Sequence, residues 1–194
     1  MKFTYILSVL LQALLVSAAQ AGDSGLIELG ELVVRGTGCP SGSASLDAEN
    51  SKLILNFDEY SVIAGDNQKA VDYKACSVAL GIKLPPGLSV AISKADYRGS
   101  LLVPSGGSVT VSREYFFAGS KGKVKKTEIK KKLKGNFILR DNISSKNKVW
   151  SECGADTNLR INTSLLAKAN KDNQLVRASI GSQSIYQLDL KSCQ

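Results

Sequence analysis

The side chains that could carry out acid–base chemistry in this chain are carboxylates, because its 194 residues include no histidine. Without histidine there is no Ser–His–Asp or Cys–His catalysis, no histidine metal ligand and no proton shuttle that works near neutral pH. Two carboxylates could still hydrolyse a glycosidic bond. The candidates for such a pair are Asp58, Glu59, Asp96, Glu114, Glu152 and Asp156. Their spacing selects no pair, so we expect a protein that is not an enzyme and uses no cofactor.

The second reactive group is a set of four cysteines, Cys39, Cys76, Cys153 and Cys193. No two of them have C-x-x-C spacing, which argues against a zinc site. An even number in a secreted chain predicts two disulfides, and four cysteines allow three pairings. We favour Cys39–Cys76 and Cys153–Cys193, each worth about 4 kcal/mol in the loop-entropy model. We expect no metal; the loops "DAEN" (47–50) and "GDNQ" (65–68) offer oxygen ligands for calcium but lack the twelve-residue calcium-loop pattern.

A lysine-rich segment, "KGKVKKTEIKKKLKG" at residues 121–135, carries the excess positive charge. Its eight lysines stand against Glu128 alone, and the rest of the chain after residue 21 is balanced in charge. The lysines are Lys121, Lys123, Lys125, Lys126, Lys130, Lys131, Lys132 and Lys134. We expect one arm of a projecting hairpin, with its turn at "AGSKGK" (118–123). Such lysines protect a sheet edge from pairing with other chains, or bind an anionic polymer or surface.

Few aromatic residues are available for stacking, and the lysine-rich segment contains none. A single-stranded nucleic-acid site needs aromatic side chains among the basic ones, so we expect no specific nucleic-acid ligand. Trp150, Tyr60, Tyr73, Tyr97 and Tyr115 could stack on sugars. The alternative is that each is a partly buried core residue whose polar tip finds a partner, with Trp150 packed on a disulfide.

The first 21 residues have the features of a secretory signal peptide: Lys2, an apolar run from Ile6 to Val16, and small residues around Ala21. The apolar run is too short to cross a bilayer, which needs about 20 residues. We therefore expect a secreted protein, periplasmic in a Gram-negative host, with no transmembrane segment. Residues 22–37 are expected to form an arm or edge strand, and residues 38–194 one domain.

Short strands are predicted along the domain from alternating apolar residues. The clearest pattern is Cys76–Leu84, followed by "PPG" (85–87) and a second alternating run from Leu88 to Ile92, which together suggest a hairpin. Similar runs start near residues 53, 109, 137, 159, 176 and 186. Strands at this spacing predict an all-β fold, a single antiparallel β-sandwich with jelly-roll or immunoglobulin-like layering.

Several short motifs, taken in order, resemble a family of small secreted fungal and bacterial proteins catalogued as domain of unknown function 4360. They are "GTGCPSGSAS" (36–45), "LILNFDEYSVIAG" (53–65), "LPPG" (84–87), "DYRGSL" (96–101), "YFFAG" (115–119), "VWSECG" (149–154) and "LRINTSL" (159–165). The resemblance implies a secreted, disulfide-bonded, β-rich domain. It offers no catalytic residue.

Three functions agree with these observations. The first is a non-enzymatic binding protein that docks its basic segment on an anionic polysaccharide or envelope surface. The second is a structural or interaction protein with no polyanion ligand, in which the lysines keep a sheet edge soluble. The third is a polysaccharide hydrolase that uses two carboxylates. We rank them in this order.

Overall fold

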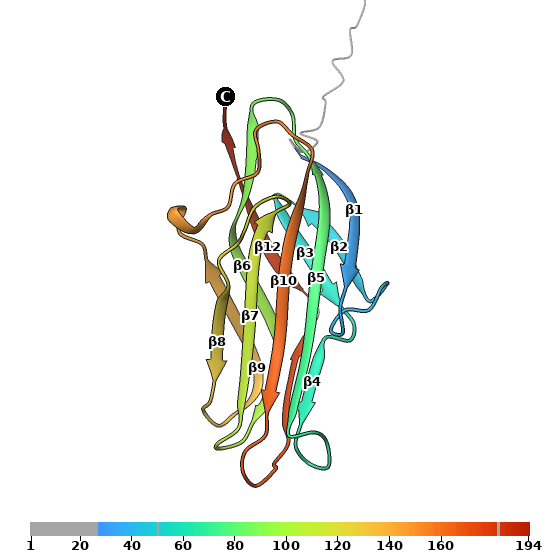
Figure 1. Ribbon diagram of the computed structural model, residues 1–194, viewed down its shortest axis with the longest axis vertical. Helices are drawn as coiled ribbons and strands as arrows, with labels where there is room; N and C mark the ends of the chain where they lie inside the picture. Colours follow the sequence, from blue (N-terminus) through green and yellow to red (C-terminus); the bar gives the residue numbers. More distant parts are fainter. Residues whose placement is uncertain (1–26, 50, 182) are drawn as a thin grey trace, which may run out of the picture.

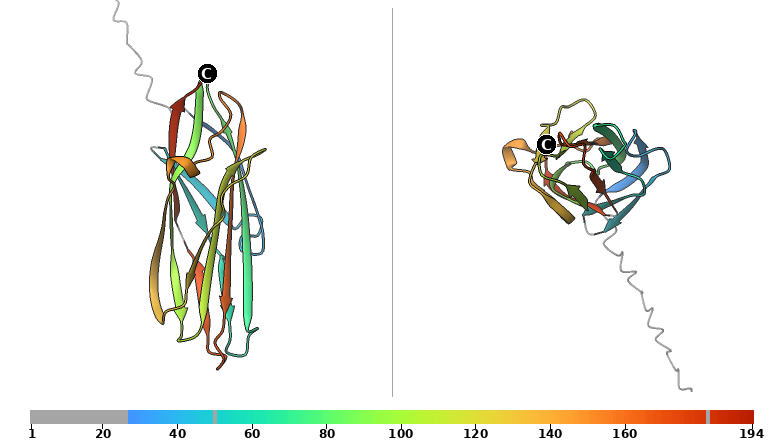
Figure 2. Two further views of the ribbon diagram at one scale, coloured as in Figure 1. Left: turned by 60° about the vertical axis from the view of Figure 1, so that its left-hand side comes forward. Right: turned by 90° about the horizontal axis from the view of Figure 1, so that it is seen from below.

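The computed structural model describes residues 27–49, 51–181 and 183–194, which form a two-layer antiparallel β-sandwich. The predicted signal peptide lies outside these residues. Figures 1 and 2 show the strands running along the length of an elongated body, with the C-terminus at one end. In the described part of the chain, no helix is long and apolar enough to cross a membrane. The all-β sandwich expected from the sequence is confirmed.

Sheet A has five strands in the order β1-β5-β10-β7-β8. These are β1 (Glu28–Arg35), β5 (Val71–Lys83), β10 (Thr157–Lys168), β7 (Ser108–Phe117) and β8 (Lys125–Ile129). β1 is an edge strand, so the arm expected over residues 22–37 includes part of sheet A.

Sheet B has seven strands. Its path is β2-β3-β12-β6-β11-β4, and β9 pairs with the other side of β6. The bounds are β2 (Ala44–Glu49), β3 (Lys52–Phe57), β12 (Ser184–Ser192), β6 (Leu88–Val103), β11 (Val176–Ile180), β4 (Ser61–Ala64) and β9 (Leu133–Asn142). A 3-10 turn, η1 (Ser145–Asn147), follows β9.

The core lies between the two sheets and is built by the alternation read from the sequence. Inward-facing side chains such as Leu80, Ile161 and Tyr97 are at most 2 % exposed, and their neighbours along each strand face outward. Tyr97 and Tyr186 meet edge to face, with ring centroids 5.8 Å apart. Burial of this apolar area is the main stabilising contribution to the fold.

The hairpin predicted around "PPG" is wrong. β5 pairs with β1 and β10 in sheet A, whereas β6 pairs with β9, β11 and β12 in sheet B. The turn at residues 85–87 therefore carries the chain from one sheet to the other (Figure 1). The two strands lie in different layers of the sandwich, and alternation alone does not distinguish strands of different sheets from paired strands.

β6 is 16 residues long, and its partner on one side changes from β12 to β11 near Gly99. A Cβ atom at Gly99 would lie 1.8 Å from the carbonyl oxygen of Ser179, so only glycine allows β11 to approach this closely. The "YRG" motif thus joins a buried tyrosine to a glycine required by close backbone contact.

Two disulfides cross-link the domain. Cys39 is bonded to Cys76, and Cys153 is bonded to Cys193. This is the pairing that we favoured from the sequence. The second bond ties the chain after η1 to the C-terminus, where the amide of Cys193 also donates to the carbonyl oxygen of Gly87 over 2.9 Å.

Candidate functional site

The lysine-rich segment follows one side of the molecule, along the edges of both sheets. Its first half forms β8 at the edge of sheet A, residues 130–132 cross over, and its second half begins β9, which pairs with β6 in sheet B (Figure 1). The turn at residues 118–123 joins β7 to β8 as expected. The single basic hairpin is not confirmed, because the segment is divided between two sheets.

All eight lysines of this segment are exposed. Lys125 pairs with Asp141 at 2.7 Å, and Lys130 pairs with Glu128 at 3.1 Å. Within the described part of the chain, the other six have no acidic partner: Lys121, Lys123, Lys126, Lys131, Lys132 and Lys134. We call these six residues together with Lys125 and Lys130 the basic edge.

Basic residues on the outer face of sheet B extend the basic edge, and the sequence analysis missed them. Lys134 of β9 stands opposite Leu102 of β6, which stands opposite Arg177 of β11. Further along the same face come Arg98, Arg140 and Lys94, all exposed. Among these three, only Arg140 forms an ion pair within the described residues, with Asp96 at 3.7 Å. These charges stand on alternate residues of β6 and β9. The pattern is visible in the sequence, but it shows that the charges share one face only when the pairing of β6 with β9 is known.

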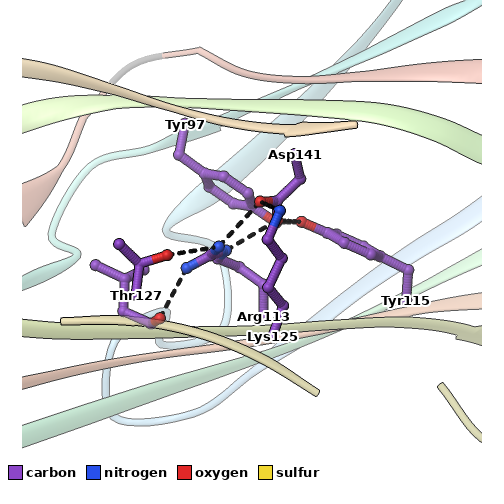
Figure 3. Close-up of polar contacts among 7 residues, drawn as sticks. Tyr97, Arg113, Tyr115, Lys125, Thr127 and Asp141 are labelled. Carbon is purple, nitrogen blue, oxygen red and sulfur yellow. Dashed lines mark hydrogen bonds and ion pairs between the residues drawn. The ribbon is translucent and has the colours of Figure 1, made fainter. Parts of the chain in front are cut away.

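A buried ion pair beneath the basic edge joins the two sheets (Figure 3). Arg113 of β7 binds Asp141 of β9 through two parallel bonds of 2.9 Å, and both side chains are fully buried. The guanidinium also donates to the carbonyl oxygen of Val111 and to the hydroxyl of Thr127, over 2.8 and 3.0 Å. A forked arrangement of this kind fixes orientation as well as distance.

Asp141 has two further donors. The Tyr115 hydroxyl donates to it over 2.8 Å, and the Lys125 ammonium reaches it from the surface. Burial raises the pKa of Asp141, but hydrogen bonds from Arg113, Lys125 and Tyr115 outweigh it and hold the pKa below its ordinary 3.8. An ionised carboxylate with four donors has no role as a general acid. It is suited to fixing β9, and with it part of the basic edge.

A cavity of about 240 Å³ lies between the two sheet edges above this ion pair. Apolar side chains such as Ile92, Val149 and Leu159 line its interior, while Lys123 and Lys125 contribute the basic part of its lining. The cavity lies between the first residue of β8 and the last residues of β9.

The carboxylates considered for catalysis are spread over the surface. Asp58 and Glu59 are exposed, Asp96 lies beside Arg140, and Glu114 accepts a hydrogen bond from Asn162 on the outer face of sheet A. Glu152 and Asp156 do come together, since both line a second cavity, of about 230 Å³. No group of three or more acidic or cysteine side chains in the described residues could hold a metal ion.

The aromatic residues divide between core and surface. Tyr60 and Tyr97 are buried, and their hydroxyls bond Thr163 and Tyr115 over 3.0 and 2.9 Å. Tyr73 differs, because 56 % of it is exposed on the outer face of sheet A. Trp150 lines the cavity that holds Glu152 and Asp156 and has the Lys191 ammonium 4.3 Å from its ring centroid.

Comparison with known proteins identifies the family. The chain belongs to the family described as domain of unknown function (DUF4360), whose model matches residues 26–193. An uncharacterized secreted protein of Arthroderma benhamiae is 30 % identical over 158 residues, which cover 79 % of this chain and 64 % of that protein. The match therefore spans less than two thirds of the relative's length. With the two disulfides, this relative confirms that the protein is secreted.

A structural comparison gives a weaker likeness. The structure of TmCBM61 in complex with beta-1,4-galactotriose has 11 % sequence identity and a TM-score of 0.28, with 84 % of this chain and 88 % of that chain covered. At this score the likeness carries no argument about a ligand.

Proposed function

We propose that this secreted β-sandwich is a non-enzymatic binding protein that attaches to an anionic polymer or surface, such as an acidic envelope polysaccharide, through its basic edge. The observation that carries the proposal is the placement of eight exposed lysines along adjacent edges of the two sheets, six of them without an acidic partner in the described residues. Clustered, unneutralised charge of one sign raises the local concentration of counter-ions and steers their association.

Two features favour binding over simple protection of the sheet edge. A few lysines protect an edge from pairing with other chains. Here the basic residues continue from β9 onto the outer face of sheet B, where Lys94, Arg98 and Arg177 lie away from the edge. The buried Arg113–Asp141 pair also ties the end of β9 to β7, which limits the movement of the two edges relative to each other. A rigid array loses less entropy when it binds a polymer.

The test is retention on a polygalacturonate matrix. In one variant, five lysines of the basic edge without an acidic partner are changed to glutamine: Lys121, Lys123, Lys131, Lys132 and Lys134. The control variant loses the same charge elsewhere through glutamine at Lys52, Lys69, Lys74, Lys168 and Lys171, none of which forms an ion pair in the described residues.

We expect the wild type and the control variant to be retained at about 0.1 M salt and released near 1 M, as the Debye length falls from about 10 Å to about 3 Å. The basic-edge variant should elute without retention, with an unchanged unfolding midpoint. Equal loss in both variants would mean that net charge alone acts, and the proposal would then be wrong. A wild type that is not retained would favour a structural or interaction protein with no polyanion ligand.

A second candidate function rests on the cavity shared by Glu152, Asp156 and Trp150. Two carboxylates beside an aromatic ring form the minimal equipment of a glycoside hydrolase, which works with carboxyl groups about 5 to 9.5 Å apart. If this is the function, the protein releases reducing ends from a polysaccharide, and Glu152→Gln and Asp156→Asn each abolish the release. No release by the wild type from glucan, mannan or polygalacturonate would remove this candidate.

A further inference from the structure

The outer face of sheet A carries an ordered row of polar side chains that the proposed function does not use. The register places Arg35 of β1 opposite Ser77 of β5, Ser77 opposite Asn162 of β10, and Asn162 opposite Glu114 of β7. Successive strands lie about 4.8 Å apart, so the row extends across the sheet for about 14 Å. It runs perpendicular to the strands, on the opposite side of the sheet from the core.

Hydrogen bonds fix the middle of this row. The Ser77 hydroxyl donates to Oδ1 of Asn162 over 2.8 Å, and Nδ2 of Asn162 donates to Oε2 of Glu114 over 3.1 Å. The orientation of the amide and the carboxylate is thereby set before any ligand arrives. The Arg35 side chain has no hydrogen-bond partner in the described part of the chain, and neither do the hydroxyls of Ser112 and Ser164 in the next row.

The row lies in an open cleft of about 340 Å³. Small side chains form its floor, since the neighbouring row along the strands consists of Ala75, Ser164 and Ser112. Tyr73 also lines the cleft, two residues before Ala75 on β5, with 56 % of its surface exposed. The exposed Tyr73 ring beside these fixed polar groups is available to stack on a ligand.

We propose that this cleft binds a polysaccharide chain through the hydroxyl groups and apolar ring faces of its sugars. A pyranose ring presents hydroxyls, each able to donate and accept, around a face of C–H groups. The cleft offers a matching set: an acceptor on Glu114, donors on Arg35, and two free hydroxyls, next to a tyrosine ring on which a C–H face can stack. Because the cleft is open along the sheet surface, a long polysaccharide can lie across it and extend beyond the protein at both ends.

This inference goes beyond the proposed function because it does not depend on surplus charge. Hydrogen bonds and stacking at a fixed site lose little strength in salt, whereas contacts made by the exposed lysines are screened. The two sites adjoin on sheet A, where Lys126 of the basic edge stands opposite Ser112 in the cleft, but they use different side chains. The five lysines that are changed in the basic-edge variant all lie outside the cleft lining. One can therefore fail while the other holds.

The experiment is affinity electrophoresis in gels that contain soluble neutral β-glucan, mannan or xylan, followed by equilibrium binding at about 1 M salt. The protein is prepared in bacteria, because Asn162 lies in an Asn-Thr-Ser glycosylation sequon. The test variants are Tyr73→Ala and Asn162→Ala. The matched control is Val71→Ala, an outward-facing apolar residue on the same strand, 47 % exposed and outside the cleft lining.

We expect at least one neutral polysaccharide to bind at high salt, and each test variant to weaken that binding at least about tenfold. Val71→Ala and the basic-edge variant should bind it like the wild type. The inference is overturned if no neutral polysaccharide binds, if Tyr73→Ala binds as well as the wild type, or if Val71→Ala loses as much. Binding of polygalacturonate alone, and only at low salt, would assign recognition to the basic edge and overturn it too.

Discussion

The most decisive test of the structural reasoning is the change Asp141→Asn, which removes one charge and keeps the shape of the side chain. Asp141 and Arg113 are both fully buried, so the guanidinium would remain in the interior without its anion. Removing one member of a buried pair costs about 3–5 kcal/mol in the free energy of unfolding. For a domain of this size, about 1 kcal/mol shifts the melting temperature by about 2–4 °C, so we expect a fall of about 6–20 °C.

A double variant separates the buried charge from the packing. Replacing the pair together, as Arg113→Met with Asp141→Leu, leaves no uncompensated charge, and such replacements are often neutral or stabilising. The double variant should therefore lose less stability than Asp141→Asn alone, in spite of one more substitution. Measured together with the single variants Arg113→Met and Asp141→Leu, the double variant completes a cycle that isolates the coupling between the two side chains.

Urea unfolding with the disulfides intact, followed by circular dichroism, gives the free energies, and a scanning calorimeter gives the melting temperatures. The reasoning is refuted if Asp141→Asn costs less than about 1 kcal/mol, which is the value of an exposed ion pair. It is also refuted if the double variant is as unstable as the sum of the two single variants, because the residues would then act independently.

Three other changes give further expected outcomes. Tyr186→Phe should leave stability unchanged or raise it, because the buried Tyr186 hydroxyl, although near the hydroxyls of Tyr97 and Ser184, makes no hydrogen bond of good geometry within the described residues. Tyr115→Phe should cost about 1.5–3 kcal/mol, because it removes a donor to Asp141; urea titrations distinguish the two variants. The pKa of Asp141 in the folded state lies below 3.8. The stabilising contribution of its carboxylate is therefore complete above pH 3.8 and is lost as the pH falls through the folded-state pKa. Measured against pH, the free energy of unfolding should decline less steeply in Asp141→Asn than in the wild type. Replacing Cys153 and Cys193 by serine should lower the free energy of unfolding by about 4 kcal/mol, because the disulfide closes a loop of about 40 residues. A loss below about 1 kcal/mol in a urea titration would contradict this loop-entropy explanation.

The strands could be predicted from the sequence because each has a buried and a solvent-facing side. Leu159, Ile161 and Leu165 alternate with polar residues in the sequence and face the core in the structure. Strand partners could not be predicted in the same way. The turn at residues 85–87 has the composition of a hairpin turn, yet it joins strands in different sheets, because partner choice depends on contacts with distant strands such as β10 and β12.

The candidate site was also predictable from the sequence only in part. The lysines at residues 121–134 are local in sequence, and their exposure follows from their charge. Arg113 and Asp141 gave no signal, because they are 28 residues apart and meet only when β7 and β9 lie on facing sheets. The row of Ser77, Asn162 and Glu114 is likewise formed by strand register, which separates residues by up to 85 positions in the chain.

The strand order also sets when this protein can fold. The middle of sheet A is β10 and the strand between β3 and β6 in sheet B is β12, and both belong to residues 157–192. A polypeptide that threads through a translocation pore with its N-terminus leading cannot complete either layer until this last portion has emerged, because the earlier strands lack their central neighbours. Cys193 leaves the pore later still, so the second cross-link closes at the end. Pairing between such distant segments is slow, and neither sheet is complete until nearly the whole chain has crossed.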